Sequence, residues 1–237
     1  MNVLKKILLL GILPVFFCKS YGQSGSLNTT NRFDTLFIPH KYVNIVKTNP
    51  FIPLWGTIPF TAEYRIVYEG VIAKNQTVLM SFSYLGKSPF IAVMENQFPA
   101  NGSISPSFLI KGFRLQAAHR VYLAKLNENM GYYPYAPEGF YIGPHISYAT
   151  ANFGEKSTFA YNYITFNQFN FVLMTGLQTF IDQFAIDVFF GLGYKKNTVS
   201  EWRNSQIIYH DPAEIMGNFY ASPVKIYLGF NAGIGFN

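Results

Sequence analysis

The thirteen residues 224–236 near the end of the chain alternate strictly between two kinds of side chain. One set is apolar and consists of Val224, Ile226, Leu228, Phe230, Ala232, Ile234 and Phe236. The other set is polar or small and consists of Lys225, Tyr227, Gly229, Asn231, Gly233 and Gly235. Successive side chains of a β-strand point to opposite faces, and three alternate glycines disfavour a helix. Residues 224–236 are therefore predicted to form a strand with one apolar face.

The same two-residue period recurs in six segments further upstream. Their apolar sets begin at Phe60, Val78, Phe113, Phe140, Phe169 and Phe184. An eighth segment, residues 42–49, is weakly patterned. The connections 69–75 and 181–183 are short, whereas 86–107 and 197–221 are long and fall on the opposite side. The connection 123–138 is longer than this alternation requires, and 50–56 is shorter.

Composition decides what kind of sheet these strands form. Only 13% of the residues are charged, against about a quarter in soluble domains, while 18% are aromatic. A barrel whose strands are apolar at every second residue accounts for the low charged fraction and the high aromatic fraction, and it needs no long apolar run in the sequence. We therefore predict an all-β protein, an eight-stranded antiparallel up-and-down transmembrane β-barrel over residues 41–237. A soluble lipocalin-like barrel would need an apolar interior, whereas here the apolar face is predicted to point outward.

The N-terminus has the features of an export signal. Lys5 and Lys6 precede the apolar stretch 7–17, and small residues at Ser20 and Gly22 suit cleavage before Gln23. The stretch is too short for a membrane-spanning helix, which needs roughly 20 residues. We expect a signal peptide over residues 1–22, a flexible periplasmic leader over 23–40 and the cell outer membrane as destination. The bulky Phe17 before Cys18 argues against a lipid-modified cysteine.

The strand pattern, together with residues 138–144 (EGFYIGP) after residues 120–123 (RVYL), resembles a family of small eight-stranded outer-membrane barrels from Bacteroidota. That family is known mainly as a domain of unknown function. The C-terminal strand is similar to the assembly signal of outer-membrane barrels, although it ends on Asn237 rather than on the aromatic Phe236. The resemblance implies a fold, a location and recognition by the barrel-assembly machinery, and it implies no activity.

The predicted inward positions collect the charged side chains of the strands. They are Glu63, Arg65, Arg114, Gln116, Arg120, Asp187 and Lys225. The interior of an eight-stranded barrel is only wide enough for side chains to fill it, and buried charges must be paired. The favoured interpretation is a salt-bridged network that fills the lumen. A narrow passive channel with an anion preference is the alternative.

One segment has a catalytic arrangement. His145 and Ser147 are two residues apart, as in a lipid A deacylase barrel, and Glu155 follows. A histidine base activates a serine when an acid orients its ring. The alternation turns His145 and Ser147 toward the lumen, whereas an enzyme acting on lipid needs its nucleophile on the membrane side. A structural pair is therefore favoured over a lipid A-modifying enzyme.

The remaining expectations concern partners. Trp202, Arg203 and Tyr209 in the last long connection are the predicted binding residues, because aromatic residues and Arg dominate binding hot spots. The aromatic cluster of Tyr132, Tyr133 and Tyr135 is predicted to lie at the membrane–water interface. Lipid and lipopolysaccharide of the outer membrane, and an envelope protein, are the expected partners. The basic residues form no cluster for nucleic acid, and the scattered His40, His119 and His210 give no metal or cofactor site.

Overall fold

The computed structural model describes residues 42–54, 56, 58, 60–97, 108–124 and 136–237. The chain divides into two units, residues 1–39 and 40–237, and the description concerns the second. The predicted signal peptide and leader, Cys18 and the cluster of Tyr132, Tyr133 and Tyr135 lie outside the described residues.

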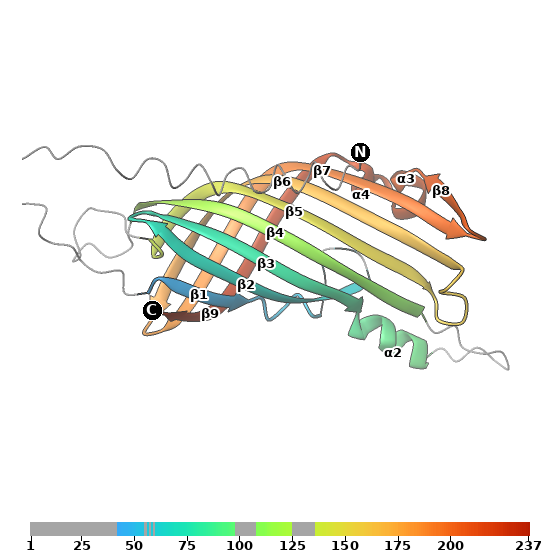
Figure 1. Ribbon diagram of the computed structural model, residues 1–237, viewed down its shortest axis with the longest axis horizontal. Helices are drawn as coiled ribbons and strands as arrows, with labels where there is room; N and C mark the ends of the chain where they lie inside the picture. Colours follow the sequence, from blue (N-terminus) through green and yellow to red (C-terminus); the bar gives the residue numbers. More distant parts are fainter. Residues whose placement is uncertain (1–41, 55, 57, 59, 98–107, 125–135) are drawn as a thin grey trace, which may run out of the picture. The chain divides into compact units, whose positions relative to one another are not determined.

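Eight antiparallel strands form a closed ring (Figure 1). They are β1 (Asn44–Thr48), β2 (Thr61–Ala73), β3 (Gln76–Lys87), β4 (Phe108–Ala124), β5 (Gly139–Glu155), β6 (Asn162–Ile181), β7 (Phe184–Arg203) and β9 (Val224–Phe236). Each strand pairs with its neighbour in the chain, β9 pairs with β7, and β1 pairs with β9 to close the ring. The prediction of an eight-stranded antiparallel up-and-down β-barrel is thereby confirmed as far as strand number, pairing and closure.

The predicted alternation holds along the strands. On β9, Val224, Ile226 and Leu228 are exposed on the outside of the ring, and the intervening Tyr227 is buried. β2 is longer than predicted. Residue 69 is predicted to lie in the connection 69–75, but Glu69 belongs to the strand, and its side chain lies inside the ring.

The two ends of the ring differ in their connections. At one end, here the turn end, residues 74–75 and 182–183 join strands tightly, and the C-terminus lies there too (Figure 1). The opposite end, here the loop end, carries the helix α2 (Pro89–Gln97), residues 156–161, and the segment after β7. None of the helices in the described part of the chain is long and apolar enough to cross a membrane.

The segment 197–221 is more ordered than the expected long loop. β7 continues to Arg203 and forms a hairpin with β8 (Gln206–His210), which pairs with β7 alone. The short helices α3 (Pro212–Met216) and α4 (Asn218–Ala221) follow. Asp211 caps α3 by accepting a hydrogen bond from the Ala213 N–H. The predicted loop is therefore a hairpin and two helical turns, because β7 stays paired with β6 as far as Arg203 and pairs with β8 from Val199.

Apolar side chains fill the interior between and beside the polar residues. Near the loop end, Ile58 from the β1–β2 connection packs with Leu85 and Phe166, and all three are fully buried. Further along the lumen, Tyr122, Tyr141 and Phe189 pack with Met174. The ring therefore encloses a packed core rather than an open bore.

Candidate functional site

All seven polar residues predicted for the lumen lie on inward positions of their strands. Six are buried, namely Glu63, Arg65, Arg114, Gln116, Arg120 and Asp187, while Lys225 is partly exposed. They do not form one network. The structure divides six of them between two groups, and Lys225 lies beside the second group.

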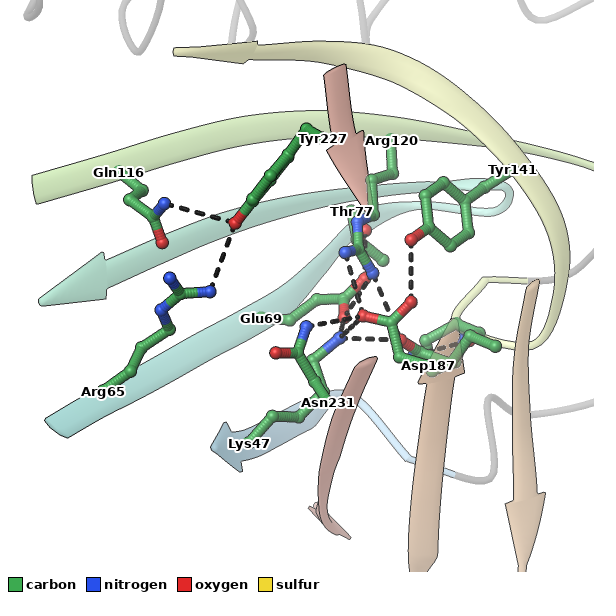
Figure 2. A network of polar contacts seen from close by, with 12 residues as sticks. Lys47, Arg65, Glu69, Thr77, Gln116, Arg120, Tyr141, Asp187, Tyr227 and Asn231 are labelled. Atoms are coloured by element: carbon green, nitrogen blue, oxygen red, sulfur yellow. Dashed lines mark hydrogen bonds and ion pairs between the residues drawn. The ribbon is translucent and has the colours of Figure 1, made fainter. Parts of the chain in front are cut away.

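The first group, the turn-end cluster, consists of Lys47, Glu69, Thr77, Arg120, Tyr122, Tyr141, Gln178, Asp187 and Asn231. Figure 2 shows the Asp187 carboxylate at its centre. Its Oδ2 accepts from Lys47 Nζ at 3.0 Å and from an Arg120 nitrogen at 3.0 Å. Tyr141 Oη donates to the other carboxylate oxygen at 2.7 Å.

Glu69 is the second carboxylate of the turn-end cluster. It forms ion pairs with Lys47 and Arg120, and its other oxygen accepts from Thr77 Oγ1 at 2.6 Å and from Tyr122 Oη at 2.9 Å. Two cations thus face two carboxylates, and each cation contacts both. Burying charges is costly unless pairing and hydrogen bonds compensate it, and this neutral cluster provides both.

Local sequence explains how Arg120 reaches the cluster. Gly143 of β5 lies against β4, and a Cβ at that position would overlap the carbonyl oxygen of His119. The missing side chain therefore allows β4 to lie close to β5 beside Arg120. The Arg120 guanidinium then stacks on the Tyr141 ring, with 4.1 Å from its Cζ to the ring centroid. A planar guanidinium is suited to stacking and ion pairing at once.

The second group, the loop-end cluster, consists of Glu63, Arg65, Ser83, Arg114, Gln116, Gln168 and Tyr227. Glu63 Oε1 accepts from two Arg65 nitrogens at 2.6 and 3.0 Å and from Ser83 Oγ at 2.8 Å. Its Oε2 accepts from Arg114 at 2.9 Å. Two guanidiniums therefore share this one carboxylate.

Tyr227 of β9 joins the members of the loop-end cluster across the lumen. Its hydroxyl oxygen accepts from Arg65 at 3.2 Å and from Gln116 at 3.5 Å (Figure 2). Lys225, two residues earlier on the same strand, places its Nζ 5.8 Å from the centroid of the Tyr227 ring. In the part of the chain that the structure describes, Lys225 forms no ion pair with a carboxylate.

Two cavities adjoin the loop-end cluster. The inner one has a volume of about 10 Å³, and its walls include Arg114, His145, Ser147 and Lys225. The outer one has a volume of about 260 Å³ and lies among Asn49, Ile52, Arg65, Phe189 and Tyr220. Tyr227 lines both.

His145 and Ser147 lie inside the ring, each 5% exposed. Ser147 Oγ accepts from Asn170 Nδ2 at 2.8 Å, and the His145 ring packs against Tyr227 with 5.2 Å between ring centroids. His145 Nδ1 is buried with no hydrogen-bond partner among the described residues. Glu155 is exposed at the end of β5. The structure therefore does not assemble these three residues into a base, nucleophile and acid.

The predicted binding residues lie on the β7–β8 hairpin. Tyr209 is 78% exposed, and Arg203 is also exposed. Trp202 is partly buried and stacks on Tyr163, with 6.3 Å between ring centroids. His210 Nε2 lies 3.0 Å from Glu201 Oε2 across the hairpin. Tyr209 is thus available to a partner, whereas Trp202 stabilises the hairpin.

Sequence reasoning missed Lys47, Glu69 and Tyr122 of the turn-end cluster. Extending the alternation from Arg65 by four residues predicts an inward Glu69, so this signal was present. Lys47 gave no such signal, because β1 has only five residues.

No group of three or more metal-ligating side chains occurs among the described residues. Comparisons with known protein families, curated proteins and solved structures give no match to this chain.

Proposed function

We propose that this chain is a transmembrane β-barrel of a bacterial outer membrane, with a closed lumen and a structural or surface-interaction role. The observation that carries the proposal is the outer face of the ring. Ile66, Met80, Leu173 and Leu228 come from four different strands and are between 55% and 76% exposed. An apolar belt around a closed sheet matches the hydrocarbon core of a bilayer. It would be a liability in water.

Strand length and aromatic placement support the same proposal. A tilted membrane-spanning strand needs about 9–11 residues, and β3 and β9 have 12 and 13. On the outer face, Tyr64, Tyr84 and Phe113 are cross-strand neighbours toward the loop end. Phe113 also packs against Tyr148, with 6.5 Å between ring centroids. Aromatic girdles of this kind border the apolar belt of outer-membrane barrels.

The filled lumen favours a structural or binding role over a channel. Buried ion pairs occupy the cross-section at the turn-end cluster, and Ile58 packs inside the ring near the loop end. A conducting pore would have to break the contacts of Asp187 with Lys47 and Arg120. We expect no steady conductance from the purified protein in a planar bilayer. The inward position of His145 and Ser147 likewise gives no support to catalysis on lipid, and Ser147→Ala is expected to leave lipid A unchanged.

The β7–β8 hairpin is the proposed interaction surface at the loop end. β8 is an edge strand, and Ile207, Ile208 and Tyr209 are between 40% and 78% exposed. Exposed aromatic and aliphatic side chains beyond the membrane belt suit an envelope protein or lipopolysaccharide as partner. A photo-crosslinking residue at position 209 should capture a partner in cells, and the same residue at position 182 on the turn end should not.

The membrane proposal is tested by placing a charge on the outer face. Leu173→Arg introduces a cation in the middle of the belt, where Leu173 is 56% exposed and flanked by Pro144 and Leu192. In a bilayer such a change costs about 2–4 kcal/mol, so folding into lipid vesicles should be impaired. Tyr209→Arg on β8 is the control and should fold normally. Recovery of the wild-type protein in the soluble fraction, folded without detergent, would contradict the proposal.

A further inference from the structure

Among the described residues, the loop-end half of the lumen contains more cations than carboxylates. Arg65 and Arg114 share the single carboxylate of Glu63. Lys225 lines the same inner cavity as Arg114 and adds a third cation without an ion pair among the described residues. A buried charge is costly unless an opposite charge compensates it. This region therefore favours an anion.

The inner cavity also presents hydrogen-bond donors. Ser147 Oγ already accepts the Asn170 N–H, so its own hydroxyl proton is available to an occupant. The Lys225 ammonium has three N–H groups, none of which bonds to a carboxylate in the described part of the chain. His145 is 5% exposed, and its Nδ1 has no described partner. Asn170 Oδ1, which belongs to another residue lining this cavity, is also buried without a described partner. Unsatisfied buried polar atoms in a native structure call for an explanation, and a bound anion accounts for the His145 nitrogen.

We propose that the inner cavity binds one halide-sized anion, with chloride as the abundant biological example. A cavity of about 10 Å³ has room for about one water molecule, and chloride is only slightly larger. A phosphate or a carboxylate does not fit there. The excess positive charge selects an anion over water, and the N–H and O–H groups of Lys225 and Ser147 provide its coordination.

The outer cavity gives the anion a route from the loop end. It is lined by Asn49 and Ile52 of the β1–β2 connection and by Tyr220 of α4. Tyr227 lines both cavities, and Arg65 lines the outer one. The proposal does not depend on membrane insertion, because the residues that line the inner cavity lie on inward positions of their strands.

Bromide is the probe, because it replaces chloride and scatters X-rays anomalously. Crystals of the full chain grown in sodium bromide should show an anomalous peak in the inner cavity beside Lys225. In halide-free gluconate buffer of constant ionic strength, added bromide should raise the melting temperature in a saturable manner, as ligand binding to the folded state requires. Lys225→Met should abolish this rise, and Ser147→Ala should weaken bromide binding by roughly 5-fold, as for a lost hydrogen bond.

Lys196→Met is the matched control, because Lys196 is exposed on the outer side of β7. It should keep the full bromide response. An empty inner cavity in the bromide crystals overturns the proposal, and so does an equal bromide response in the Lys225→Met and Lys196→Met variants. If Lys225→Met does not fold, the anomalous peak and the Ser147→Ala titration decide the question.

Discussion

The two polar clusters inside the ring compensate buried charge differently. In the turn-end cluster, Lys47 and Arg120 each contact both Glu69 and Asp187, so the charges cancel within the protein. In the loop-end cluster, two guanidiniums share Glu63, and Lys225 lies nearby without a carboxylate partner among the described residues. The ionic charges of the turn-end cluster are thus balanced within the protein, whereas those of the loop-end cluster leave positive charge in excess in the described part of the chain. The first is suited to holding the ring together and the second to binding.

The tyrosines of the two clusters repeat this difference. At the turn end, Tyr122 and Tyr141 donate their hydroxyl protons to carboxylates, at 2.9 and 2.7 Å. At the loop end, the Tyr227 hydroxyl accepts from Arg65 at 3.2 Å, as an anion would. Tyrosine therefore adds donors where negative charge is buried and an acceptor where positive charge is in excess. In both clusters, the role of the tyrosine hydroxyl as donor or acceptor therefore matches the sign of the charged group that it contacts.

The largest expected effect is the loss of the central carboxylate of the turn-end cluster. Asp187→Asn leaves Lys47 and Arg120 with Glu69 as their only carboxylate in the cluster. Breaking a buried ion pair from one side typically costs about 3–5 kcal/mol. Urea titration of the protein folded in detergent micelles should show a loss of this size in the free energy of unfolding. Asp182→Asn, at an exposed turn position, is the control and should change it little.

The comparison is sharpest between two inward lysines that undergo the same substitution. Lys47→Met removes a cation that three acceptors contact, and should cost about 3 kcal/mol because Glu69 and Asp187 lose a partner. Lys225→Met removes a cation that no carboxylate contacts among the described residues. In halide-free buffer it should leave the free energy of unfolding unchanged or raise it. Equal losses for the two variants would contradict the division into a neutral and a cationic cluster.

The sequence predicted this architecture better than it predicted the partners within it. Alternation along a strand is local, so the inward positions of Asp187 and Arg120 follow from their neighbours in the chain. Their pairing with Lys47 does not, because Lys47 and Asp187 are 140 residues apart and meet only when β1 closes the ring against β9. Which carboxylate faces which cation depends on strand register all round the barrel. No local pattern contains that information. An excess of cations is visible in the predicted inward set, but its position at the loop end is not.

Two tyrosine variants test the opposite hydrogen-bonding roles with a smaller change. Tyr141→Phe removes a donor to the buried carboxylate of Asp187, and bonds to charged groups contribute about 1.5–3 kcal/mol. Tyr227→Phe removes an acceptor whose bonds to Arg65 and Gln116 are longer, at 3.2 and 3.5 Å, so about 1 kcal/mol or less is expected. The free energies of unfolding of both variants should be measured in the same detergent. A larger loss for Tyr227→Phe would show that the loop-end cluster is the tighter one.

The smallest effect is expected for a lysine–glutamate pair outside the ring, which isolates the contribution of burial. Lys87 Nζ lies 2.6 Å from Glu95 Oε2, but these side chains are 27% and 17% exposed, whereas those of Lys47 and Glu69 are fully buried. Glu95→Gln should therefore cost less than about 1 kcal/mol, and high salt should remove the difference.

The Lys87 hydrogen bond lowers the pKa of Glu95. Its stabilisation is thus present above the ordinary glutamate pKa and disappears as the pH falls through the lowered value. Unfolding free energies of wild type and Glu95→Gln should then converge at low pH, and a gap that persists there would show that the effect does not come from the charge of Glu95.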